Sequence, residues 1–291
     1  MRMDDQGESQ NVEDVRGSSG GFRPVHGIGL GTILVALIGG WIFGINPLQI
    51  LSLLGGGTSS SIQAPAADEP GQPPPAGDPE AKFVSQILRS TEQVWTRVFQ
   101  ERGAVYEEPK LRLFRDAYPT ACGLGQAAAG PFYCPQDRVV YLDLSFFDVM
   151  TQQLGAPGQF AHAYVIGHEV GHHVQNLLGT IDRVDAQRAR GDEARSNALS
   201  VRLELQADCF AGVWATRSQQ ERGWRLDDGD IETALNAASQ IGDDTLQRRT
   251  RGVVVPESFT HGTSAQRVAW FKRGVESGQI DACDTFAAAR L

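Results

Sequence analysis

The chain has 291 residues, of which 41% are hydrophobic, and it carries a formal net charge of −9. A chain of this length and composition can bury a sizeable core. Because binding to nucleic-acid phosphates needs a basic protein surface, the acidic balance argues against a nucleic-acid partner.

Three segments precede the expected folded domain: a tail, a membrane anchor region and a linker. Residues 1–22 are polar and acidic, which predicts a disordered tail. Residues 23–54 form a predicted membrane anchor region, within which Ile28 to Ile45 contains no charged residue. As a transmembrane helix with ~1.5 Å per residue, this apolar stretch would span roughly 27 Å, enough to cross a bilayer. A cleaved signal peptide is the competing interpretation, but the A-x-A-like site at Ala64 to Ala66 lies too far downstream.

The charges around the apolar stretch predict its orientation. Arg16 and Arg23 precede it, whereas the next basic residue downstream is Lys82. The positive-inside rule therefore predicts a single-pass protein of the cytoplasmic membrane, with a cytoplasmic N-terminus and an extracytoplasmic remainder, either periplasmic or extracellular. Residues 55–77 are rich in Gly, Ser and Pro, which predicts a linker.

The folded domain is predicted over residues 78–291. Asp78 is a suitable N-cap for a helix that starts at Pro79, and paired apolar residues mark one face of this helix until Gly103. Three strand-like stretches follow, at residues 111–114, 131–134 and 138–142. Two later helices are predicted at Asp228 to Leu246 and at Ser264 to Ser277. The predicted fold class is therefore α+β, mainly α, with a small antiparallel sheet.

The sequence His168-Glu169-Val170-Gly171-His172 has the H-E-x-x-H pattern. Apolar periodicity predicts a helix from Gln159 to Leu178, which Gly179 would end. Residues i and i+4 share a helix face, so His168 and His172 can bind one Zn²⁺ together. Glu169 would then lie beside the open coordination position and act as general base. His173 points about 100° away from His172, which favours a surface or supporting role over a ligand role.

A catalytic zinc site needs a third protein ligand. The helical stretch Val201 to Ala215 places Glu204 and Asp208 on one face, at positions i and i+4. Glu204 can complete a His₂Glu set, and Asp208 can accept the free ring N–H of one histidine. The alternative is that both are ordinary solvated acids, but small and apolar neighbours argue against a charged surface stripe.

The chain has four cysteines, Cys122, Cys134, Cys209 and Cys283. An even number in an extracytoplasmic domain indicates disulfides, and three pairings are possible. The simplest is Cys122–Cys134 with Cys209–Cys283, because the first pair closes a local loop. The alternative, that Cys209 is a zinc ligand, is disfavoured because it points about 100° away from the face of Glu204 and Asp208.

Two segments carry a family resemblance. The sequence H-E-V-G-H-H-V-Q at His168 to Gln175, followed by E-L-Q-A-D-C-F-A-G at Glu204 to Gly212, resembles the gluzincin pattern of H-E-x-x-H with E-x-x-x-D. The chain is most similar to the bacterial neutral zinc metallopeptidase family, and N-V-E-D-V-R-G at Asn11 to Gly17 fits that family too. The resemblance implies a zincin-like catalytic domain, with zinc ligands at His168, His172 and Glu204 and the catalytic acid/base at Glu169.

The resemblance also implies two further features. In zincin-like folds an edge strand beside the active-site helix pairs with an extended peptide, and Arg138 to Leu142 is the candidate; the alternative is an ordinary buried strand. Gluzincins often use a later His or Tyr to stabilise the transition state, which makes His261 the candidate here. The alternative is a loop histidine that caps the next helix or packs locally.

We therefore expect a membrane-anchored peptidase with one Zn²⁺ per chain, acting on extracytoplasmic proteins or peptides. The alternative is an inactive, metal-stabilised binding or scaffolding module. The sequence does not predict the oligomeric state.

Overall fold

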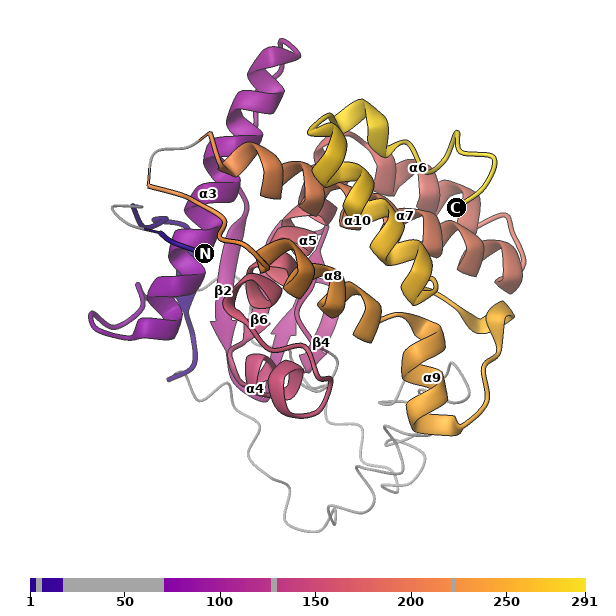
Figure 1. Cartoon of the computed structure of the whole chain (residues 1–291), viewed down its shortest axis with the longest axis horizontal. Helices are drawn as coiled ribbons and strands as arrows, with labels where there is room; N and C mark the ends of the chain where they lie inside the picture. Colours follow the sequence, from indigo (N-terminus) through magenta and orange to yellow (C-terminus); the bar gives the residue numbers. More distant parts are fainter. Residues whose placement is uncertain (4–6, 18–70, 127–129, 221–222) are drawn as a thin grey trace, which may run out of the picture. The chain divides into compact units, whose positions relative to one another are not determined.

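The computed structural model describes residues 1–3, 7–17, 71–126, 130–220 and 223–291, which form one compact unit. Its first helix is α3 (Pro79–Glu101), labelled in Figure 1. The Asp78 side chain accepts hydrogen bonds from the backbone N–H groups of Glu80 and Ala81, and Arg102 is the C-cap residue. This confirms the predicted start and end of the helix.

The sheet beside this helix contains both parallel and antiparallel pairs. Its strand order is β1 (Val12–Asp14), β2 (Lys110–Phe114), β6 (Val139–Asp143) and β5 (Phe132–Cys134). The β1/β2 and β2/β6 pairs are parallel, whereas β5 and β6 are antiparallel. A separate antiparallel hairpin consists of β3 (Ala117–Thr120) and β4 (Gly123–Gln126). The prediction of a small antiparallel sheet is therefore correct only for the hairpin and the β5/β6 pair.

The prediction that residues 138–142 form an edge strand open to a peptide substrate is wrong. β6 lies between β2 and β5, and all of its residues are buried. Because both of its neighbours use its backbone hydrogen-bonding groups, β6 has no open edge for a peptide. β5 is the terminal strand of the sheet on this side, within the ranges that the structure describes.

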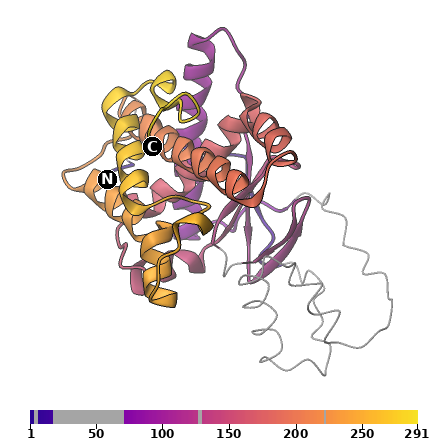
Figure 2. The ribbon, with the colours of Figure 1, turned by 90° about the vertical axis from the view of Figure 1, so that its right-hand side faces the viewer.

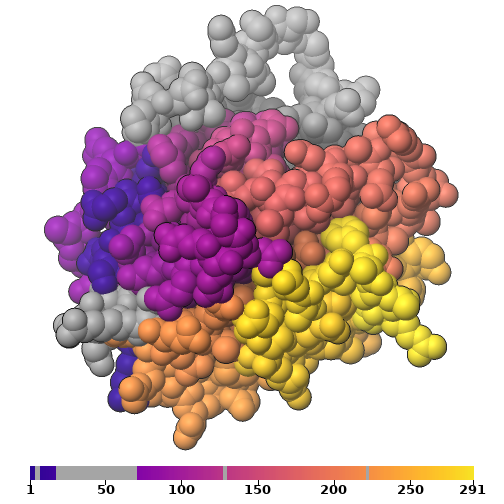
Figure 3. Space-filling model, turned by 90° about the horizontal axis from the view of Figure 1, so that it is seen from above, coloured from indigo at the N-terminus to yellow at the C-terminus, as the bar shows by residue number. Residues whose placement is uncertain are grey.

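The prediction of a disordered tail over residues 1–22 is wrong for the residues around β1. β1 pairs in parallel with β2, and Asp14 also forms an antiparallel bridge with Gln72. The Ser9 hydroxyl donates to Glu92 of α3 at 2.5 Å. In Figure 3 the indigo N-terminal residues lie against the magenta residues of α3. Polar residues hold this segment in place because their partners are charged groups of the folded unit.

The pairing of β1 also corrects the predicted membrane topology. The hydrogen bonds between β1 and β2 require residues 12–14 and 110–114 to be on the same side of any membrane. A cytoplasmic N-terminus with an extracytoplasmic domain is incompatible with this sheet. The predicted anchor region at 23–54 and residues 55–70 of the predicted linker lie outside the described residues. No helix within the described residues is long and apolar enough to cross a bilayer.

The remaining helices follow in chain order. They are α4 (Ser145–Gln152), α5 (Gln159–Leu177), α6 (Thr180–Arg188), α7 (Glu193–Ser218), α8 (Asp230–Gln240), α9 (Asp243–Arg251) and α10 (Ser264–Ser277), with 3₁₀ turns η2 (Pro256–Ser258) and η3 (Ile280–Cys283). The helix predicted from 228 to 246 is two helices, broken at Gly242. A Cβ atom on Gly242 would lie 2.3 Å from the backbone nitrogen of Ser264, so the chain passes too close to α10 for any side chain there.

The motif helix α5 is central to the unit. It contacts α3 and β5 as well as α7 and α8, and Figure 2 shows the sheet on one side of the unit with α8 to α10 on the other. α5 and α7 approach closely because Gly171 has no side chain, and a Cβ atom there would lie 3.0 Å from the carbonyl oxygen of Ala207. This close contact brings the two helices that carry the predicted ligands together.

Both predicted disulfides are present. Cys122 pairs with Cys134, and Cys209 of α7 pairs with Cys283 of η3. The alternative of Cys209 as a zinc ligand is therefore wrong, because its sulfur is already bonded.

Candidate metal centre

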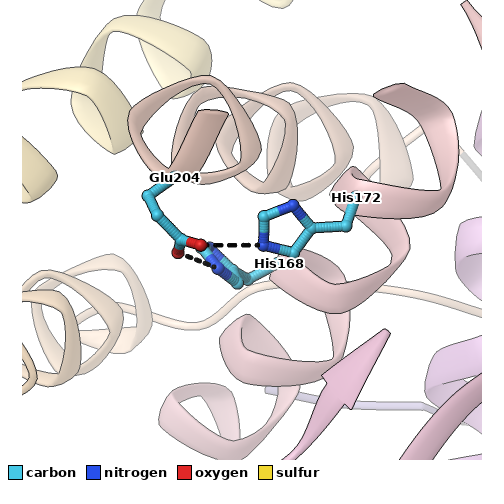
Figure 4. Close-up of side chains that lie close together, drawn as sticks. All are labelled: His168, His172 and Glu204. Atoms are coloured by element: carbon cyan, nitrogen blue, oxygen red, sulfur yellow. Dashed lines mark hydrogen bonds and ion pairs between the residues drawn. The ribbon is translucent and has the colours of Figure 1, made fainter. Parts of the chain in front are cut away.

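α5 and α7 bring three potential metal ligands together. His168 Nε2 lies 3.2 Å from Glu204 Oε2, and His172 Nε2 lies 3.5 Å from Glu204 Oε1. One ligand atom from each residue lies within 4.8 Å of the others. Figure 4 shows both imidazole rings directed toward the Glu204 carboxylate. Spacing on one helix and the crossing of a second helix therefore build the group that the sequence predicts.

The geometry of this group fits zinc. In a tetrahedron with metal–ligand bonds of about 2.0 Å, neighbouring ligand atoms lie roughly 3.3 Å apart. The two nitrogen–oxygen distances, 3.2 Å to Oε2 and 3.5 Å to Oε1 of Glu204, are close to that value, and one donor atom from each of the three residues lies within 4.8 Å of the others. Two nitrogens and one carboxylate oxygen also match the donor types that zinc prefers at catalytic sites.

His168 is held by a buried polar network. Its Nδ1 lies 2.8 Å from Asp208 Oδ1, as predicted for an acceptor that fixes the ring. Tyr164 donates its hydroxyl to the same oxygen at 2.5 Å, and Arg267 of α10 donates from Nε to Asp208 Oδ2 at 2.9 Å. Asp208 is fully buried, so its charge depends on these partners. The network therefore directs Nε2 of His168 toward Glu204.

Charges at the site shift several pKa values. Although burial opposes protonation, Asp208 and Glu204 raise the pKa of His168 to about 10. Burial would also raise the pKa of Asp208, but the charges of Arg267 and His168 lower it. Despite its burial, Glu204 has a pKa well below its usual value because of His172 and His261. A divalent cation bound at this position would compete with the proton on His168.

Glu169 lies next to the three potential ligands, but its side chain is not hydrogen-bonded to them. Its side chain is 7% exposed, and burial raises its pKa. It forms no hydrogen bond to any residue that the structure describes, although its charge interacts with His168, His172 and Glu204. A carboxylate in such an environment is available to accept a proton from a bound molecule.

The structure places His261 near the same site, on the loop before α10. Its Nδ1 lies 3.2 Å from Asp243 Oδ1, and the side chain is 51% exposed. Although burial would lower it, Glu204 and Asp243 raise the pKa of His261. Asp243 Oδ2 also accepts backbone N–H groups from Thr260, His261 and Gly262 at 2.8, 2.6 and 3.0 Å. Asp243 therefore anchors this loop independently of the imidazole ring.

His173 is not part of the candidate metal centre. Its ring is fully buried, with Nδ1 2.9 Å from the hydroxyl of Tyr133 and Nε2 donating to the carbonyl of Glu107 at 2.6 Å. The predicted direction away from His172 is confirmed. The predicted surface or supporting role is wrong, however, because the His173 side chain is buried in the core between α5 and β5.

Sequence reasoning missed four supporting residues: Arg267, Asp243, Gln175 and Tyr164, whose hydroxyl donates to Asp208. Arg267 interrupts the apolar face of α10 and is nevertheless buried. Asp243 is the first residue of α9, where an acidic residue is ordinary. Gln175, one turn after His172, lies 2.8 Å from that ring. The clearest sequence signal among these residues is Arg267, a cation on the apolar face of an amphipathic helix, which indicates a buried ion pair. The sequence does not show that Asp208 is its partner.

Comparisons with known proteins identify the family of the chain. The chain matches the family described as "Putative neutral zinc metallopeptidase" over residues 1–286. It is 49% identical to "Uncharacterized protein YpfJ" of Escherichia coli (strain K12) over 294 residues, which cover 98% of this chain and 99% of that protein. It is also 47% identical to "Uncharacterized protein Rv2575" of Mycobacterium tuberculosis (strain H37Rv) over 197 residues, 64% of this chain and 65% of that protein.

The chain therefore belongs to this zinc metallopeptidase family. No solved structure matches it. The zincin-like fold consequently stays a prediction.

Proposed function

We propose that the protein is a zinc-dependent peptidase in which His168, His172 and Glu204 hold one Zn²⁺. The observation that carries the proposal is the convergence of two imidazole nitrogens and one carboxylate, with donor atoms within 4.8 Å of one another. Zinc would polarise the peptide carbonyl and acidify a bound water. Glu169, buried beside the ligands and lacking a hydrogen-bond partner among the described residues, takes the proton from water and passes it to the leaving amine.

His261 has the features of a transition-state donor in this scheme. Asp243 orients its ring and anchors its backbone, and the charge of Glu204 interacts with it. Hydrolysis develops negative charge on the carbonyl oxygen, and a positioned imidazolium across from the metal stabilises that charge.

We propose proteins or peptides as substrates and an oxidising compartment as the location. Two disulfides in one folded unit support an extracytoplasmic site of action. The terminal strand β5 contacts α5 and replaces β6 as the strand available to pair with an extended peptide.

Membrane attachment through residues 28–45 also belongs to this proposal, with one condition from the described residues. Because β1 pairs with β2 and Asp14 bridges to Gln72, both ends of the intervening segment must lie on one side of the membrane. Tags at the N-terminus and the C-terminus should therefore show equal protease sensitivity in intact spheroplasts. Sensitivity at only one end would show that β1 is separated from the sheet in the cell.

The metal and activity are tested together. The purified protein should contain one Zn²⁺ per chain, and Glu204→Ala should lose it. Glu169→Gln should keep zinc and fold while hydrolysis of an unfolded protein substrate falls by orders of magnitude. The control Glu276→Gln changes an acid that is 65% exposed on α10 and should leave both unchanged. Zinc binding without any Glu169-dependent hydrolysis would instead support an inactive binding module.

The role of His261 has a separate test. His261→Ala should lower kcat roughly 10²-fold, with KM and zinc content nearly unchanged, because the interaction forms mainly in the transition state. The loop should stay in place, since its backbone bonds to Asp243 do not involve the ring. An unchanged kcat would remove His261 from the mechanism.

A further inference from the structure

The two histidines of the candidate metal centre are oriented by different kinds of acceptor. His168 faces the Asp208 carboxylate, which Arg267 neutralises. His172 Nδ1 lies 2.8 Å from the amide oxygen of Gln175, one turn further along α5. An ionised carboxylate can only accept hydrogen bonds, whereas an amide has one accepting and one donating end. The orientation of the Gln175 amide therefore decides what His172 does.

That orientation follows from the other contacts of Gln175. The side chain is fully buried, and its Nε2 donates to the carbonyl of Leu203 at 2.7 Å and to Gln206 Oε1 at 3.2 Å. Since both neighbours are acceptors, the amide nitrogen must face them. The amide oxygen is then directed at His172, so Nδ1 of this ring must carry the proton. Nε2 is left with its lone pair toward Glu204.

The same side chain connects two ligands. Leu203, whose carbonyl accepts from Gln175, immediately precedes Glu204. Gln206 is fixed in turn, because its own Nε2 donates to the carbonyl of Cys283 at 3.0 Å. Cys283 is bonded to Cys209 of α7. Hydrogen bonds therefore run from His172 on α5 through Gln175 to the backbone of the turn that carries Glu204.

We propose that Gln175 is a positioning residue that holds His172 as the Nδ1–H tautomer and so prepares its Nε2 to bind the metal. This inference rests on the proposed zinc site. Loss of the acceptor would allow the ring to rotate or to change tautomer, and outer partners of metal-binding histidines typically contribute about 10–100-fold to metal affinity.

Zinc affinity, measured by competition with a chromogenic chelator, tests the proposal. Gln175→Met keeps the approximate volume but removes the acceptor, and we expect the dissociation constant for Zn²⁺ to rise about 10–100-fold. The matched control is Gln247→Met. Gln247 is also buried, donates to Ser258 Oγ at 2.9 Å and accepts from the backbone N–H of Val255 at 2.8 Å, on α9. This variant should bind Zn²⁺ like the unmodified protein.

A second variant separates orientation from packing. Gln175→Glu keeps an acceptor for His172 Nδ1 but cannot donate to Leu203 or Gln206. We expect it to recover most of the zinc affinity lost in Gln175→Met, although both variants lose the same donor bonds. The Co²⁺-loaded Gln175→Glu protein should also keep the visible absorption spectrum of the unmodified protein, whereas Gln175→Met should change it.

The outcomes distinguish the two proposals. If the unmodified protein binds no Zn²⁺, the metal site itself fails and this inference fails with it. If the unmodified protein binds Zn²⁺ and Gln175→Met binds it equally well, only the positioning role is overturned. Equal losses in Gln175→Met and Gln175→Glu would also overturn it, because the loss would then come from the donor bonds.

Discussion

The helices that carry the candidate site and the sheet beside them are held together in different ways. α7 and α10 cross at two glycines, where a Cβ atom on Gly274 would lie 2.0 Å from the carbonyl oxygen of Cys209 and one on Gly212 would lie 2.2 Å from that of Phe271. β1, by contrast, reaches the sheet from a distant part of the chain and is held by ladder hydrogen bonds and ion pairs of Glu13. The ligand geometry thus depends on close packing, whereas the sheet edge depends on charges.

The buried ion pair of the helical region should show the largest effect. Arg267→Met removes one of the two cations that face the buried Asp208 carboxylate and leaves only His168 beside it. Breaking a buried ion pair costs roughly 3–5 kcal/mol. Chemical denaturation of the variant should show this loss in the free energy of unfolding. Lys272→Met on the same helix removes a side chain that is 60% exposed and should cost little. A loss below about 1 kcal/mol for Arg267→Met would mean that His168 alone compensates the charge of Asp208.

The disulfides allow a direct comparison, because each region contains one. Cys209–Cys283 joins residues 74 apart and Cys122–Cys134 joins residues 12 apart. In the chain-entropy model these contribute about 4.5 and about 3 kcal/mol respectively. Paired Cys→Ala variants, compared by denaturation without reductant, should therefore differ by roughly 1.5 kcal/mol, with the helical region more affected. The reverse order would show that native contacts, more than loop length, determine the contribution of each disulfide.

The crossing of α7 and α10 predicts a slightly smaller loss. Gly274→Ala places a methyl group against the backbone of α7, which cannot move aside as a side chain does. We expect a loss of about 3 kcal/mol, the upper end for an overpacked core, together with weaker zinc binding because Asp208 and Arg267 lie on these two helices. Gly7→Ala is the control, since nothing lies within 4 Å of its added Cβ atom. Normal stability of Gly274→Ala would show that the helices can separate.

The same contrast explains how much the sequence predicted. Local patterns correctly predicted α5, α10, the cap at Asp78 and the common helix face of His168 and His172, because periodicity and capping act within a few residues. The i and i+4 spacing of Glu204 and Asp208 was also sufficient to place both near those histidines.

The features that were predicted wrongly or missed depend on distant partners. β1 has only three residues, and its partner strand begins near residue 110, so no local pattern distinguishes it from a polar tail. Strand order is likewise not a local property, which is why β6 was mistaken for an edge strand. Arg267 and Gln175 were missed for the same reason, since only the packing of α5, α7 and α10 gives them partners.

The sheet edge should show the smallest loss, one that depends on pH. Although burial alone would raise it, hydrogen bonds from Lys110 and Arg112 lower the pKa of Glu13. A carboxylate with a lowered folded pKa contributes stability above its unfolded pKa of about 4.5, and this contribution disappears as the pH falls through the folded value. At pH 7, Glu13→Gln should therefore cost about 2 kcal/mol, the range for hydrogen bonds to charged groups.

The difference in unfolding free energy between the unmodified protein and Glu13→Gln should narrow below about pH 4.5, where the unmodified side chain also loses its charge. Hydrogen exchange at the β1 amides should become faster in the variant at neutral pH, while exchange in α5 and α7 changes little. A difference that stays constant from pH 7 to pH 3 would show that packing of β1, and not the charge of Glu13, holds the N-terminal strand. The contrast between the two regions would then be lost, because both would depend on close contact.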